Sequence, residues 1–65
     1  MIELNKLNGN VIFVNPHLIE TIEPGSDTRI NFFTGKTMIV KNTLEEVLEK
    51  IVEYRRKLGQ NSQEL

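Results

Sequence analysis

His17 is the side chain of this 65-residue chain best suited to chemistry, because a histidine can act as a general base or a metal ligand near neutral pH. It is the only histidine, and it directly follows Asn15-Pro16. No serine, cysteine or pair of acids is spaced to work with it. The chain has no cysteine, which excludes disulfides and thiolate metal sites. We interpret His17 as an exposed turn residue.

Three acids, Glu20, Glu23 and Asp27, lie close enough in sequence to suggest a cation site. Their spacing matches no calcium-binding loop. We interpret them as edge-strand and turn charges, which discourage pairing between strands of different molecules. The glycine turns at Asn8-Gly9 and at residues 34–36 lack the glycine spacing or the helix start of a phosphate loop. We therefore expect no enzyme, no cofactor and no metal.

One basic run, Tyr54-Arg55-Arg56-Lys57, has two compatible interpretations. It could contact an acidic protein surface or anionic lipid. It could also complement the dipole at the end of a helix. The formal charge of the whole chain is −1, which argues against nonspecific binding to nucleic acid.

The size and hydropathy of the chain predict a single cytoplasmic domain. The longest apolar run has four residues, so no segment spans a membrane, and no signal-peptide pattern is visible. Cores of chains below 70–80 residues rarely supply more than ~3–5 kcal/mol of stability. Because the sequence predicts neither a disulfide nor a metal site, association with another chain is the remaining way to add stability to so small a core.

Five short strands are predicted before the period changes, from alternation in the first and from short apolar or β-branched runs between turns in the others. Residues 11–14 do not alternate, since all four are apolar. Turns are expected at Asn8-Gly9, at Asn15-Pro16 and around two glycines further on. The expected strands cover residues 2–7, 11–14, 18–23, 28–33 and 37–41, and the alternative for the third is a strand that follows one helical turn. We predict that they form a small, curved antiparallel meander.

The following residues have the 3.6-residue period of an amphipathic helix. Thr43 and Glu46 form a capping-box pattern at its start, and Gly59 is expected to end it. The face expected to pack on the sheet comprises Leu44, Val47, Leu48, Ile51, Tyr54 or Arg55, and Leu58. The fold class is therefore α+β, with one domain over residues 1–59 and a disordered polar tail over residues 60–65.

Four residues are predicted to form a second apolar face: Ile12, Val14, Phe33 and Ile39. One helix covers only one face of such a sheet, so this second face needs another explanation. Strong curvature could bury both faces in one small barrel. Alternatively, the second face or a sheet edge packs against another copy or a partner.

An ordered set of short motifs resembles the small bacterial FlbD family of flagellar proteins, also called the SwrD swarming motility family. The set comprises Ile2-Glu-Leu, Leu7-Asn8-Gly9, Asn15-Pro16, Leu18-Ile19-Glu20, Ile22-Glu23, Asp27-Thr28, Gly35-Lys36, Val40-Lys41 and the helix ending in Tyr54-Arg55-Arg56. The resemblance covers residues 1 to about 58. The chain departs from it at four turn positions, His17, Ser26, Thr34 and Asn42, where the family usually has an acid, a proline, an asparagine and an acid.

The resemblance implies a cytoplasmic flagellar accessory protein, without enzymatic activity or cofactor, that supports motility and swarming by raising the power of the flagellar motor through its stator. Our hypothesis is an adaptor that contacts the cytoplasmic part of the motor. The residues proposed for this contact are Asn15, Pro16, Glu20, Arg55 and Arg56. Two other classes stay open: a flagellar assembly or export chaperone or structural homo-oligomer, and a small RNA-binding module that uses Phe32 and Phe33.

Overall fold

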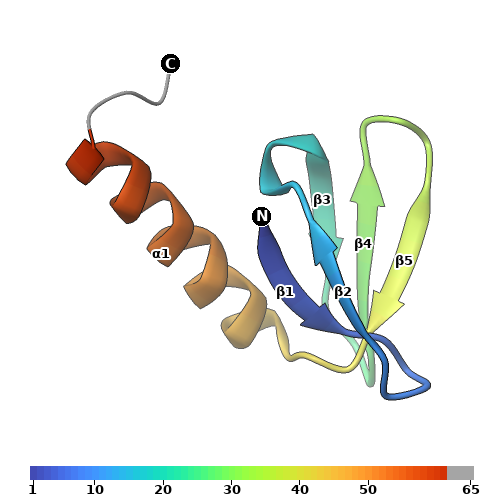
Figure 1. Cartoon of the computed structure of the whole chain (residues 1–65). Helices are drawn as coiled ribbons and strands as arrows, with labels where there is room; N and C mark the ends of the chain where they lie inside the picture. The colour runs from blue at the N-terminus through green and yellow to red at the C-terminus, as the bar shows by residue number, and fades with distance from the viewer. Residues whose placement is uncertain (62–65) are drawn as a thin grey trace.

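The computed structural model describes residues 1–61, and it has the predicted order of strands followed by one helix (Figure 1). The elements are β1 (Ile2–Asn5), β2 (Val11–Val14), a 3₁₀ turn η1 (Pro16–Leu18), β3 (Ile19–Glu23), β4 (Thr28–Phe32), β5 (Thr37–Val40) and α1 (Leu44–Asn61). All strand pairs are antiparallel. The α+β prediction is confirmed.

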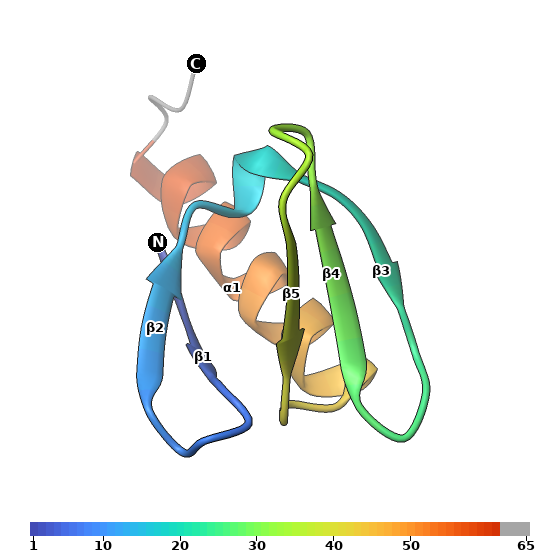
Figure 2. The ribbon, with the colours of Figure 1, turned by 90° about the vertical axis from the view of Figure 1, so that its right-hand side faces the viewer.

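The five strands form two sheets rather than one meander (Figure 2). β1 pairs with β2, and β3, β4 and β5 form the second sheet. The sheets meet at one point, where Lys6 bridges Val40 and the N–H of Lys41 donates to the carbonyl of Asn5 at 2.8 Å. The chain leaves the first sheet after β2 because Pro16 opens η1 and lacks the N–H that a continuing strand needs.

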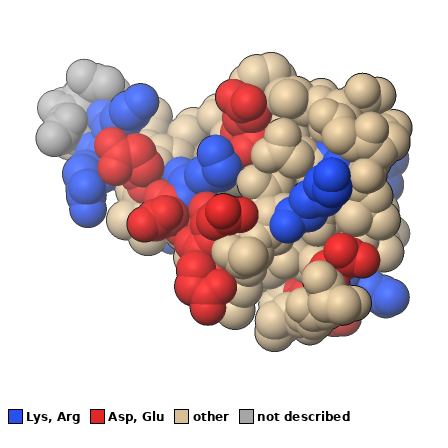
Figure 3. Space-filling model, turned by 90° about the horizontal axis from the view of Figure 1, so that it is seen from below, with Lys and Arg blue, Asp and Glu red and all other residues tan. Residues whose placement is uncertain are grey.

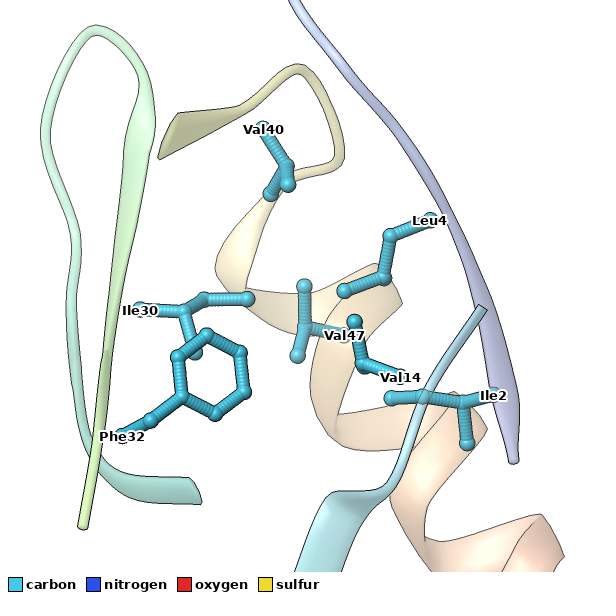
Figure 4. Packing of buried hydrophobic residues seen from close by; sticks show 7 residues of the cluster. All are labelled: Ile2, Leu4, Val14, Ile30, Phe32, Val40 and Val47. Carbon is cyan, nitrogen blue, oxygen red and sulfur yellow. The ribbon is translucent and has the colours of Figure 1, made fainter. Parts of the chain in front are cut away.

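One core lies between the two sheets and α1 (Figure 4). Both sheets turn one face toward it, and α1 adds one fully buried side chain. The buried hydrophobic residues are Ile2, Leu4, Val14, Ile30, Phe32, Val40 and Val47. The outer faces stay exposed, so the two sheets enclose a single core without burying both faces of any strand.

The faces of β2 are the reverse of the prediction. Val14 is 7% exposed, and Ile12 packs against the core. The pairing explains this: Ile12 lies opposite Leu4, and residues opposite one another in an antiparallel pair share a face. Placing Ile12 and Val14 on a second apolar face was therefore wrong. Val11 and Phe13 take the outer positions of this strand instead.

The other two residues of that predicted face, Phe33 and Ile39, are exposed. A polar network covers much of the same outer side of the three-stranded sheet. The Nδ2 of Asn31 donates to Thr21 and Glu23, and the hydroxyl of Thr37 donates to the Oδ1 of Asn31. This face is thus mixed in character rather than continuously apolar.

The start of α1 has the predicted capping box. The N–H of Glu46 donates to the Thr43 hydroxyl at 3.1 Å, and the N–H of Thr43 donates to the Glu46 carboxylate at 2.9 Å. The predicted helix end is wrong, because α1 continues through Gly59 to Asn61. Of the predicted polar tail, Gln60 and Asn61 are therefore helical, and residues 62–65 lie outside the described residues.

The longer helix changes the expected role of its basic run. No basic residue lies in the last turn, because Arg55, Arg56 and Lys57 now precede it. Dipole compensation therefore explains this run less well, since the effect falls off within the last turn. Leu48, predicted to pack on the sheet, is 45% exposed. It lies on a flank of α1 that the sheets do not cover.

Candidate protein-interaction surface

The turn at Asn15-Pro16 is held by its own hydrogen bonds. The Oδ1 of Asn15 accepts from the N–H of His17 at 3.0 Å, and its carbonyl accepts from the N–H of Leu18 at 3.0 Å. Pro16 is buried. These two residues therefore shape the turn, and Pro16 presents no side chain for the predicted partner contact.

His17 joins this turn to α1. Its ring meets the ring of Tyr54 edge-on, with 5.6 Å between centroids and 69° between planes. His17 is exposed, as predicted, but it has a partner that the sequence did not reveal. The contact places the turn beside the predicted basic run of α1, which begins at Tyr54. Two separately predicted parts of the contact surface thus lie together.

The two residues that directly follow Tyr54 in α1, Arg55 and Arg56, are both exposed. The Nη1 of Arg56 lies 3.3 Å from the Oε1 of Glu53. An exposed pair of this kind contributes little to stability, so its loss leaves the fold intact. Both guanidinium groups can therefore serve a partner without cost to the core.

Glu20 is separate from this cluster. It is exposed on β3, where the pairing with β4 shifts register between Ile19 and Thr21. Its backbone belongs to the edge of the three-stranded sheet rather than to the turn or the helix. The part of Glu20 in a partner contact therefore stays a prediction.

A shallow groove of about 260 Å³ lies between β1 and α1, and the sequence analysis missed it. Its floor includes Ile2 and Tyr54, and its rim carries charges of both signs. The lining residues are Met1, Ile2, Glu3, Lys50, Glu53, Tyr54 and Lys57. The signal in the sequence was the spacing of Lys50, Tyr54 and Lys57, which puts them on one helix face.

Phe32 and Phe33, the pair predicted to bind RNA, do not lie on one surface. Phe32 is buried, whereas Phe33 is 66% exposed, because neighbouring residues of a strand point to opposite faces. The N–H of Phe33 donates to the carbonyl of Leu18 at 2.9 Å, so Phe33 borders η1. Leu18 is also exposed, and the two form a small apolar area at this end of the molecule.

Neither a metal cluster nor a membrane-spanning helix occurs among the described residues. No three His, Asp or Glu side chains gather there in a way that could hold a metal ion. No helix among them has the length and apolarity needed to cross a membrane. The described surface offers a fixed turn, exposed arginines, a charged groove and scattered apolar side chains.

Comparison with known proteins agrees with the motifs in the sequence. A family model described as FlbD, flagellar and swarming motility proteins, matches residues 1–59. Searches of curated proteins and of solved structures each found no match. Because the family model covers nearly the whole chain, the chain belongs to the FlbD family of flagellar and swarming motility proteins.

Proposed function

We propose that this chain is a non-enzymatic flagellar accessory protein that raises the power of the flagellar motor through protein-protein contacts. Its family supports a role in motility and swarming. In this proposal the protein acts in the cytoplasm, and its partner is the cytoplasmic part of the stator or motor. The contact surface is the C-terminal half of α1 with the adjoining turn at η1.

One observation carries the proposal: Arg55 and Arg56 are exposed on a helix segment that the His17–Tyr54 contact fixes in place. Figure 1 shows that this half of α1 extends past the sheets toward the C-terminus. A protruding, ordered basic surface suits an acidic patch on a partner, because charge complementarity raises the association rate and fixes orientation. Ordering of the segment before binding also lowers the entropic cost of association.

The test measures motor torque, from the rotation of tethered cells, in a motile host from which this gene has been deleted. We expect the deletion to lower torque while filament number stays normal. Wild type restores torque, and Arg55→Glu and Arg56→Glu each restore less of it. Lys36→Glu is the matched control, because it makes the same change in charge at an exposed residue of the β4–β5 turn.

Two results would count against a role at the stator. Normal torque with few or no filaments would move the function to assembly, where a chaperone for flagellar parts acts. Equal complementation by Arg55→Glu, Arg56→Glu and Lys36→Glu would remove the basic surface from the mechanism. Immunoblots that show equal amounts of each variant exclude an effect of degradation.

A further inference from the structure

α1 has a second row of residues with coiled-coil spacing, on the flank that faces away from the core. Successive members are three and four residues apart, the spacing of the a and d positions of a heptad. We call this row the outer seam: Glu45, Leu48, Val52, Arg55 and Gly59. All five are exposed, with Leu48 at 45% and Val52 at 52%. A different row, which contains Val47, faces the core.

The outer seam matches a second copy of itself when the two helices run antiparallel. In antiparallel pairing an a residue meets a d residue of the partner. With the two-fold axis beside residue 50, Leu48 lies opposite Val52 of the second copy. Glu45 then lies opposite Arg55 of the second copy, and each contact occurs twice by symmetry. Parallel pairing would instead set Glu45 against Glu45 and Arg55 against Arg55.

The charges along the rest of α1 favour the same orientation. The first turns carry three acids, Glu45, Glu46 and Glu49, whereas the later turns carry four bases and one acid. Figure 3 shows acidic side chains grouped along the helix and basic ones beside the grey C-terminal residues. An antiparallel pair brings each acidic half against a basic half, which lowers the electrostatic energy.

The seam residues are available for such a contact. Among residues 1–61, no ion pair includes Glu45 or Arg55, whereas Arg56 pairs with Glu53. Apart from the neighbouring residues and the backbone of the helix itself, no atom lies within 4 Å of the position that a Cβ would take at Gly59. Gly59 then lies opposite position 41 of the second copy, before the start of α1, and brings no side chain there.

From these observations we infer that two copies of this chain associate through their outer seams as an antiparallel helix pair. The paired part of the seam, from Glu45 to Arg55, spans about 15 Å at 1.5 Å per residue. An interface of this length is small, so the dimer is weak and depends on concentration. The inference goes beyond the proposed function, because it specifies self-association and requires no motor protein.

The first experiment is a charge swap, followed by sedimentation equilibrium over a concentration series. Glu45→Arg and Arg55→Glu should each weaken the dimer about tenfold, which corresponds to ~1.4 kcal/mol. The double variant Glu45→Arg/Arg55→Glu should restore it to near the wild-type dissociation constant. Circular dichroism confirms that each variant keeps its helix, so a loss of dimer is not a loss of fold.

The second experiment reads the orientation by disulfide trapping, since the chain has no cysteine of its own. An oxidised mixture of Leu48→Cys and Val52→Cys should yield mainly the mixed disulfide, because these positions face each other in the antiparallel pair. Predominance of the two symmetric disulfides would indicate parallel pairing and overturn the inference.

The outer face of β2 provides the control, because Phe13 is the largest exposed apolar side chain on that strand. Phe13→Lys should leave the dissociation constant unchanged. Loss of the dimer in Phe13→Lys would assign association to the outer face of the sheet and overturn the inference. A wild-type chain that stays monomeric at every concentration would also overturn the inference. The seam would then be left for a helix of another protein. Failure of the double charge swap to restore the dimer would overturn the inference as well. Sedimentation equilibrium measures the dimer without any motor protein, and Arg56→Glu, which lies outside the seam, keeps the torque test distinguishable from the dimer test.

Discussion

Asn42 and Asn5 are 37 residues apart in the chain and are joined by two hydrogen bonds. The N–H of Asn5 donates to the Oδ1 of Asn42 at 2.7 Å, and the Nδ2 of Asn42 donates to the Oδ1 of Asn5 at 3.2 Å. The carbonyl of Asn42 also accepts from the hydroxyl of Thr28 at 2.6 Å. Asn42 is buried in the connection from β5 to α1, so it ties that connection to β1 and β4.

Asn42→Ala should lower the free energy of unfolding by about 1–3 kcal/mol, because it leaves the part-buried N–H of Asn5 without an acceptor. Urea unfolding followed by circular dichroism measures the change. Asn10→Ala is the control, since Asn10 is exposed, and it should change stability by less than ~0.5 kcal/mol. Equal effects of the two substitutions would contradict a structural role for the Asn42 side chain.

The substitution Asn42→Asp distinguishes the contributions of the two hydrogen bonds between Asn42 and Asn5. An aspartate still accepts from the N–H of Asn5, but it has no amide to donate. The Asn5 side chain can rotate its amide so that Nδ2 donates to the new carboxylate. We therefore expect Asn42→Asp to cost less than half as much as Asn42→Ala. A cost equal to that of alanine would show that the Asn5 amide does not rotate.

The capping box at the start of α1 supports a second prediction. Thr43→Ala removes the hydroxyl that accepts from the N–H of Glu46, and it should cost about 1 kcal/mol of stability. Glu46→Ala removes the reciprocal bond, and the double variant should cost less than the sum because the two bonds share one turn. The measurement is a double-mutant cycle in urea, with the exposed turn residue Ser26→Ala as control. Strict additivity would mean that the two bonds form independently.

Local patterns predicted most of the elements, because they depend on residues close together in the chain. Alternation or short apolar runs between turn residues located the strands, and Asn8-Gly9 located the first hairpin, where Gly9 has a φ of +92°. Thr43 and Glu46 located the start of α1. Each signal acts within one turn or one strand, so no knowledge of the tertiary fold was needed.

Long-range pairing accounts for what the sequence left undetermined. Four successive apolar residues in β2 give no alternation, so only the pairing with β1 decides that Ile12 and not Phe13 faces the core. The division into two sheets depends in the same way on where β1 meets β5, at Lys6 and Val40. Neither contact leaves a mark in the local pattern.

The candidate surface was predicted in part for the same reason. The basic run and the turn were each visible in the sequence, and Arg55 and Arg56 are exposed in the structure. The contact between His17 and Tyr54 that joins them connects residues far apart in the chain. The groove beside β1 likewise needs the helix to be placed before its lining can be recognised.

The end of α1 supports a third prediction, which compares two glycines. Gly59 lies inside the helix and open space surrounds its Cβ position, so Gly59→Ala should stabilise the protein by about 0.5–1 kcal/mol. Gly35 has a φ of +93°, a conformation that alanine rarely adopts, so Gly35→Ala should destabilise it by about 1 kcal/mol. Thermal unfolding at low protein concentration compares them. A destabilising Gly59→Ala would instead place Gly59 at the C′ position of a shorter helix.

Val47 and Val52 lie on the same helix and allow a direct comparison between core and surface. Val47 is fully buried among the strands, whereas Val52 is 52% exposed. Val47→Ala removes two methyl groups from a packed core, and it should lower the free energy of unfolding by about 2–3 kcal/mol. Val52→Ala should change the stability of the monomer by less than ~0.5 kcal/mol.

The effects of these two substitutions on self-association should have the opposite order. Val52→Ala trims the outer seam and should weaken the dimer, whereas Val47→Ala should leave the dissociation constant unchanged for the fraction that stays folded. Urea unfolding at low concentration and sedimentation equilibrium at high concentration measure the two effects separately. A Val52→Ala chain that loses stability like Val47→Ala would mean that this flank of α1 packs inside the monomer. The outer seam would then have no free surface for a second copy.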